Sequence, residues 1–147
     1  MNITIKTIPQ KDHRYETIGD YWFTGDKPTN SGDLEVRVSD VGDWRYELLV
    51  ALHELVEVAL LKHKGVSEPV IMAFDEAFEA KRARGEVGVN DEPGDASEAP
   101  YRDEHRFAEN LERLMAQRLG VNWDDYDKHL EKHWETQRQS VKAGGQD

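Results

Sequence analysis

The residues 48–61, LLVALHELVEVALL, place three polar side chains within an otherwise apolar run. Eleven of these fourteen residues are apolar, and the others are His53, Glu54 and Glu57. His53 and Glu57 are four residues apart, which puts them one turn apart on the same side of a helix. A carboxylate buried in such a helix destabilises the fold unless a cation or a hydrogen-bond donor compensates it. The run therefore predicts a cation beside Glu57.

The segment HELVE (53–57) differs only in its last residue from HExxH, a helical motif in which two histidines bind zinc and the glutamate is a general base. By this comparison, His53 and Glu57 are candidate metal ligands and Glu54 is the candidate catalytic base. A glutamate ligand adds negative charge, which lowers the Lewis acidity of a bound ion. The alternative is a structural role, in which His53 and Glu57 pair within the helix and an arginine compensates Glu54.

A second group of candidate ligands lies in YRDEHRFAENLERLMA (101–116). Helix periodicity places Glu104 at the centre of an apolar stripe and Asp103 at its margin. His105 lies on the flank of this stripe, together with Glu109 one turn later. Ligand chemistry favours His105 as the third ligand, because a further buried carboxylate would add to the negative charge of the site. Asp103, Glu104 and Glu109 are additional candidates.

The segment AFDEAFEA (73–80) offers two more acidic residues one turn apart, Asp75 and Glu79. If they joined the histidines and Glu57, the resulting oxygen-rich site would suit Mg²⁺ or Mn²⁺ better than a single zinc ion. Such a site would favour the hydrolysis of nucleotides or other phosphoesters. The alternative is that both residues lie on a solvated acidic face.

Hydrophobic patterns predict an α+β domain, with a small three-stranded N-terminal sheet packed on three or four helices. Strands are predicted at 3–8, 15–23 and 34–38, where residues alternate or are β-branched and aromatic. Helices are predicted at 44–64, 68–84, 101–119 and 123–138. We therefore expect a single domain over residues 1–138, with an acidic loop at 85–100 and a flexible tail at 139–147.

The helix at 44–64 and the strand at 34–38 carry the clearest packing signals. Asp43 is a suitable N-cap for the helix, and Gly65 is a suitable residue to end it. The apolar stripe centred on Leu52 is expected to be the main core face of this helix. The alternation of the strand predicts one buried and one solvated face, as for a strand at the edge of a sheet.

A short sheet followed by a helix with HE at its centre resembles a minimal zincin, in particular the small ImmA/IrrE-type metallopeptidases of phages and mobile elements. The resemblance covers about residues 34–119, and in that family an acidic residue precedes a Phe-Ala pair, as Asp103 precedes Phe107 and Ala108 here. The family has histidine where this chain has Glu57. The arrangement HRY…GDYWF…GDWRYELLVALHELVE also resembles phage and prophage proteins, which implies no activity. The resemblance implies a zincin-like fold, bound zinc and peptidase-type hydrolysis, and its alignment favours Asp103 as a ligand.

Composition limits the classes of function. The 147 residues carry a net charge of −11 and no cysteine, which excludes disulfides and cysteine-bound zinc. The negative charge argues against direct nucleic-acid binding, which requires a basic surface. No segment has the pattern of a membrane span or a signal peptide. We expect a cytoplasmic protein without membrane association, and the sequence leaves its oligomeric state open.

Three functions are compatible with these features. The first is a zincin-like, metal-dependent hydrolase of phage or mobile-element origin, active or degenerate, that uses zinc and aligns a peptide or protein partner along strand 34–38. The second is a non-enzymatic acidic phage inhibitor or adaptor, which mimics DNA or binds another protein. The third is an Mg²⁺- or Mn²⁺-dependent nucleotide hydrolase, although the strands predicted near the N-terminus count against its all-helical form.

Overall fold

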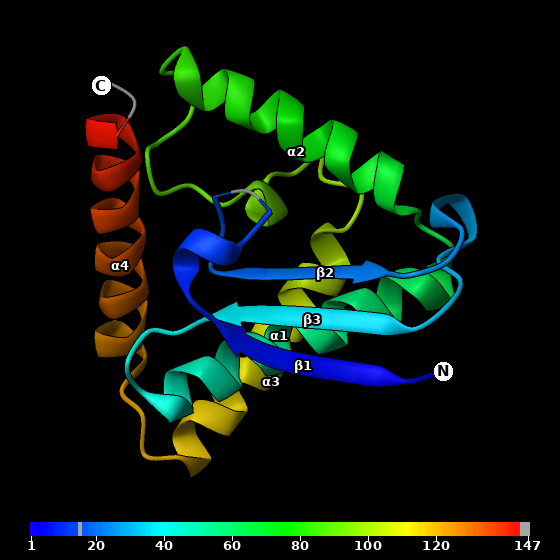
Figure 1. The fold of residues 1–147 in the computed structure, drawn as a ribbon, viewed down its shortest axis with the longest axis horizontal. Helices are drawn as coiled ribbons and strands as arrows, with labels where there is room; N and C mark the ends of the chain where they lie inside the picture. The colour runs from blue at the N-terminus through cyan, green and yellow to red at the C-terminus, as the bar shows by residue number, and fades with distance from the viewer. Residues whose placement is uncertain (15, 145–147) are drawn as a thin grey trace.

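The computed structural model describes the backbone of residues 1–14 and 16–144 and the side chains of residues 1–14 and 16–136. Within these residues the fold is α+β, with a three-stranded sheet followed by four helices (Figure 1). The strands are β1 (Ile3–Ile8), β2 (Gly19–Phe23) and β3 (Leu34–Ser39). The helices are α1 (Trp44–Lys64), α2 (Glu68–Ala83), α3 (Arg102–Arg118) and α4 (Trp123–Gly144). Short 3-10 turns, η1 (Gln10–Asp12), η2 (Lys27–Thr29) and η3 (Pro93–Asp95), lie in the connecting loops.

The sheet has the strand order β1-β3-β2, with β3 parallel to β1 and antiparallel to β2. The prediction that strand 34–38 lies at a sheet edge is therefore wrong, since β3 is the central strand. The alternation itself is observed: Leu34, Val36 and Val38 are buried, whereas Glu35 and Arg37 are partly exposed. A central strand also alternates when helices cover only one face of the sheet, so the pattern could not distinguish centre from edge.

The bounds of the first three helices agree with their predicted bounds within two residues, because their end signals are strong. The Asp43 carboxylate accepts a hydrogen bond from the Arg45 amide at 2.9 Å, and Gly65 ends α1 with a left-handed φ of 81°. The fourth helix continues to Gly144 and so includes most of the predicted tail, whose last residues, 145–147, lie outside the described residues. Among the described residues, no helix combines the length and hydropathy needed to cross a membrane.

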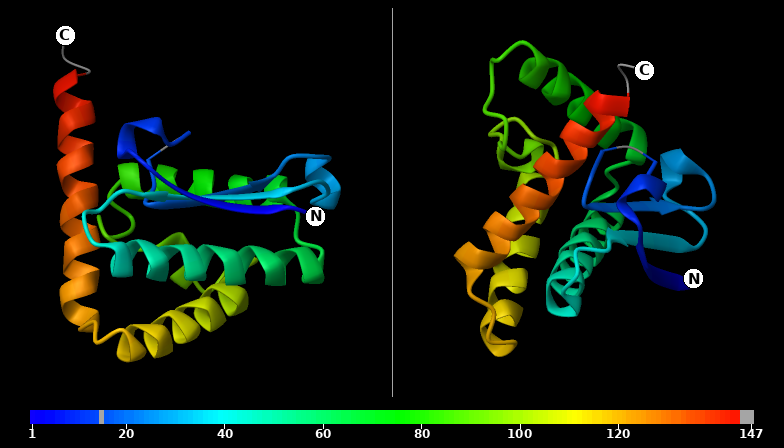
Figure 2. Two further views of the ribbon diagram at one scale, coloured as in Figure 1. Left: turned by 60° about the horizontal axis from the view of Figure 1, so that its bottom comes forward. Right: turned by 60° about the vertical axis from the view of Figure 1, so that its left-hand side comes forward.

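The elements form three layers, in which the sheet packs on α1 and α1 packs on α3 (Figure 2). Helix α4 crosses one end of these layers, and α2 runs beside β2 (Figures 1 and 2). The main core lies between β3 and α1 and continues to α3 and α4. Its most buried members are Leu34, Val36, Val38, Leu49, Val58, Ala116 and Tyr126.

Helix α1 buries only part of the predicted core stripe and also buries the side opposite to it. Leu49 of the predicted stripe is fully buried, but Leu48 is 39% exposed and Ala59 is exposed. On the opposite side Val50, Glu57 and Leu61 are buried. Because α1 is apolar around most of its circumference, periodicity alone could not identify the face that meets the sheet and α3. The consequence for function is direct, since Glu57 lies on the inner side of the helix.

The predicted acidic loop at 85–100 is folded against α3 through η3. Gly94 and Ala99 are buried within it. The Arg82 guanidinium of α2 donates hydrogen bonds to the backbone carbonyls of Gly88 at 2.9 Å and Asp91 at 2.7 Å. These contacts position the end of the loop beside the first turn of α3.

Candidate metal centre

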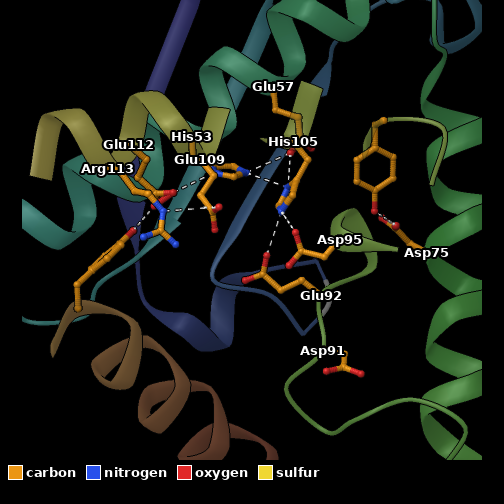
Figure 3. Close-up of polar contacts among 12 residues, drawn as sticks. His53, Glu57, Asp75, Asp91, Glu92, Asp95, His105, Glu109, Glu112 and Arg113 are labelled. Carbon is orange, nitrogen blue, oxygen red and sulfur yellow. Dashed lines mark hydrogen bonds and ion pairs between the residues drawn. The ribbon is translucent and has the colours of Figure 1, made fainter. Parts of the chain in front are cut away.

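Three potential ligand atoms converge between α1 and α3 (Figure 3). Nε2 of His53 lies 3.2 Å from Oε2 of Glu57 and 3.1 Å from Nδ1 of His105, and the last two atoms are 3.0 Å apart. His53 and Glu57 come from adjacent turns of α1, and His105 comes from the first turn of α3. Glu57 and His105 are buried, and only 12% of the His53 side chain is exposed. We refer to these three residues as the ligand triangle.

Two members of the triangle are oriented by a further hydrogen bond on their outer side. Nδ1–H of His53 donates to Oε1 of Glu112 at 2.9 Å, and the Tyr126 hydroxyl donates to Oε2 of the same carboxylate at 2.7 Å (Figure 3). The Tyr21 hydroxyl of β2 donates to Oε1 of Glu57 at 2.8 Å, which leaves Oε2 facing the two imidazoles. A carboxylate behind a histidine is the usual arrangement around metal-binding histidines, because it fixes the ring orientation and tautomer.

The electrostatics of the triangle favour positive charge. Burial lowers the pKa of His53, but hydrogen bonds to Glu112 and Glu57 outweigh it and raise this pKa to about 11. Burial likewise lowers the pKa of His105, but the hydrogen bond to Glu57 and the nearby carboxylate of Glu92 outweigh it and raise this pKa to about 10. Burial would raise the pKa of Glu57, but its hydrogen bonds with His105 and His53 lower it to about 2. These carboxylates therefore stabilise either protons on the imidazoles or a metal ion.

The spacing of the three atoms could also hold a divalent ion. If both imidazoles were protonated, two positively charged rings would donate to one oxygen of Glu57 with their nitrogens 3.1 Å apart. In a tetrahedral zinc site, ligand atoms about 2.0–2.1 Å from the ion lie about 3.3 Å from one another. The three edges of the triangle, 3.0, 3.1 and 3.2 Å, are only slightly shorter. The donor set of two imidazoles and one carboxylate also occurs in catalytic zinc sites.

Glu54, the predicted catalytic base, lies beside the triangle and packs against β2. Gly19 provides the space, because a Cβ at this position would lie 2.7 Å from Oε1 of Glu54. Burial, together with the negative charge of Glu57, raises the pKa of Glu54 to about 8. The His53–Glu57 pair of the structural alternative is observed at 3.2 Å, but among the described residues no arginine pairs with Glu54.

Of the four candidates on α3, only His105 joins the triangle. Asp103 is exposed, and Glu104 is buried but forms an ion pair with Lys64 at 2.9 Å. Glu109 lies 3.7 Å from Arg113 (Figure 3). Since successive residues of a helix are rotated by about 100°, Glu104 faces the end of α1 whereas His105 faces its middle.

The two candidates on α2 also lie apart from the triangle. Asp75 accepts a hydrogen bond from the Tyr101 hydroxyl, and Glu79 is exposed and pairs with Arg82 at 3.0 Å (Figure 3). The predicted oxygen-rich site is therefore not assembled. The physical reason is that α2 runs beside the sheet, and the loop with η3 lies between it and α3.

Sequence reasoning missed the residues that surround the triangle. Glu112 could have been found, since it follows His105 by seven residues and shares a helix face with the buried Ala108 and Ala116. Glu92 and Asp95 also approach His105, at 3.2 and 3.5 Å from Nε2. No local pattern indicates these contacts, because the tertiary fold alone brings the loop to α3.

The chain was compared with known proteins on three levels. No protein-family model, curated protein or solved structure matches it. The ligand triangle and its surroundings are therefore the basis of the proposed function.

Proposed function

We propose that this chain is a metal-dependent hydrolase in which His53, Glu57 and His105 bind a divalent cation, with zinc as the preferred ion. The observation that carries this proposal is the triangle of three ligand atoms, each within 3.2 Å of the other two. Two imidazoles and a carboxylate provide the mixed nitrogen and oxygen donors that zinc accepts. The sequence departs from HExxH at Glu57, but His105 restores the two-histidine, one-carboxylate set used by several zinc peptidases.

The chemistry divides between the ion and the chain. A bound divalent cation supplies Lewis acidity, which polarises a carbonyl oxygen and makes water more acidic. Glu54 provides the base, because its carboxylate lies next to the triangle and has no competing partner among the described residues. Glu112 and Tyr21 hold His53 and Glu57 in orientation. Together these residues provide the parts of a hydrolytic site.

A peptide is the substrate class that we favour, in line with the zincin-like resemblance and the proposed phage or mobile-element origin. An extended peptide can be aligned by pairing with an edge strand. Since β3 is central, β2 takes over the role proposed for strand 34–38. It is an edge strand of the sheet and contributes Tyr21 and Gly19 to the surroundings of Glu57 and Glu54.

The first test is the metal content of the chain, purified without a histidine tag. We expect near-stoichiometric zinc after dialysis against metal-free buffer, and its loss in His53→Ala, because this change removes one of three ligands. Elemental analysis by mass spectrometry measures both. The matched control is His63→Ala, which removes an exposed histidine from the same helix and should leave the zinc content unchanged.

Two outcomes would contradict the metal site. Protein that neither retains nor takes up zinc, Mg²⁺ or Mn²⁺ would favour the non-enzymatic acidic inhibitor or adaptor. Equal zinc loss in the His53 and His63 variants would indicate unspecific binding to the acidic surface.

A further inference from the structure

The second ring nitrogen of His105 points away from the triangle and toward η3 (Figure 3). Nε2 lies 3.2 Å from Oε2 of Glu92 and 3.5 Å from Oδ1 of Asp95. Only 9% of the His105 side chain is exposed, yet neither contact has hydrogen-bond geometry. Within the described residues, this nitrogen is thus a buried polar atom without a hydrogen-bond partner. His53 differs, since its outer nitrogen forms a 2.9 Å hydrogen bond with Glu112.

The two carboxylates are held in place by the fold of the loop. Gly94, between them, lies against the imidazole of His105. A Cβ added to Gly94 would lie 2.5 Å from Cγ of the ring. Arg82 fixes the preceding part of the loop through the backbone carbonyls of Gly88 and Asp91. A side chain at Gly94 would push the turn away from the ring. Glycine therefore permits the approach that brings Glu92 and Asp95 to Nε2.

We propose that Glu92, Asp95 and Nε2 of His105 form a second divalent-cation site, so that His105 bridges two ions. This inference rests on the proposed function, because the first ion occupies the triangle on the Nδ1 side of the same ring. The donor set again combines one imidazole nitrogen with carboxylate oxygens, which suits zinc and, with more water ligands, Mn²⁺. Nε2 of His105 is buried and lies 3.2 and 3.5 Å from two carboxylate oxygens without hydrogen-bond geometry, and a shared ion would account for this arrangement.

Charge balance supports a pair of ions. When the second ion binds, the remaining ring proton of His105 leaves to solvent, and the ring then carries one negative charge. With Glu57, Glu92 and Asp95, the ligands match the positive charge of two divalent cations. The side chains of Glu92 and Asp95 are 55% and 60% exposed, so the second ion would be open to solvent on one side. We expect it to bind more weakly than the ion in the triangle.

The test is a titration of the metal-free, untagged full chain with Zn²⁺, in which calorimetry measures the binding. Elemental analysis at a fixed concentration of free zinc counts the ions bound per chain. We expect two ions per chain in the wild type and one in the double variant Glu92→Gln/Asp95→Asn. The matched control is Glu86→Gln/Glu98→Gln, which removes the same charge from the same loop at exposed positions and should retain both ions. Nitrogen-15 NMR of His105 supplies a second measurement, since both ring nitrogens should shift in the two-ion form.

The outcomes separate this inference from the proposed function. One ion in the wild type, with Nε2 of His105 still protonated, would overturn the second site and leave the first intact. A second ion that persists in Glu92→Gln/Asp95→Asn would also overturn the second site. Loss of both ions in that variant would overturn it too, because Glu92 and Asp95 would then act only by orienting His105. Absence of any bound ion would overturn both proposals.

Discussion

Glu57→Ala is expected to lower the midpoint of thermal unfolding by on the order of 10 °C, even in excess chelator. This carboxylate is 6% exposed and accepts hydrogen bonds from both imidazoles and from the Tyr21 hydroxyl. Its removal leaves His53 and His105 facing each other with no anion between them. Breaking a buried ion pair from one side typically costs about 3–5 kcal/mol, because the remaining charge is uncompensated.

The same variant should lose its response to zinc. In the wild type, an ion that binds the folded chain and not the unfolded chain would raise the midpoint as the zinc concentration increases. Glu57→Gln tests the charge separately from the shape of the side chain. Its amide has the same shape and can accept the hydrogen bond from Tyr21, but it supplies no negative charge for the ion. The control is Glu76→Ala, at an exposed position of α2. Circular dichroism with and without zinc measures all four proteins.

A midpoint for Glu57→Ala equal to that of Glu76→Ala would show that the buried carboxylate is dispensable. A normal zinc response in Glu57→Ala would exclude Glu57 as a ligand, whatever the loss of stability. The two readings are independent, so the structural and the metal-binding role of this residue can be judged separately.

The local elements could be predicted from the sequence because their signals are local. Asp43 and Gly65 define the ends of α1, and alternation defines β3. The inner face of α1 and the central place of β3 depend on tertiary packing. The sequence pattern of a helix that is apolar on most sides, or of a single alternating strand, carries no signal for that packing. The elements could therefore be predicted, whereas the full buried surface of α1 and the central place of β3 could not.

The candidate site shows the same division. The spacing of His53 and Glu57 placed them one turn apart, and ligand chemistry favoured His105 over its neighbours Asp103 and Glu104. The structure brings His53, Glu57 and His105 together in the triangle. Spacing could not exclude Asp75, since its distance from α3 is set by the path of α2. It also could not identify Glu92, which reaches His105 only through the folded loop.

Glu54→Gln is expected to lower the turnover number of the zinc-loaded chain by about 10²–10⁴-fold, the usual contribution of a general base. Burial and the charge of Glu57 raise the pKa of Glu54 to about 8 in the metal-free chain, and a divalent cation in the triangle would lower this pKa and favour the carboxylate that accepts the proton. A glutamine has the same size but cannot take a proton from water. Because Glu54 is outside the ligand triangle, the zinc content and the unfolding midpoint should stay close to those of the wild type.

The measurement uses fluorescein-labelled casein as a peptide substrate and bis(4-nitrophenyl) phosphate as a phosphoester. Hydrolysis of casein that is lost in Glu54→Gln and in the metal-free wild type would support a peptidase with Glu54 as its base. Hydrolysis of the phosphoester alone would favour phosphoester chemistry, at a site without Asp75 and Glu79. Equal rates for Glu54→Gln and the wild type would contradict the role of Glu54 as the base.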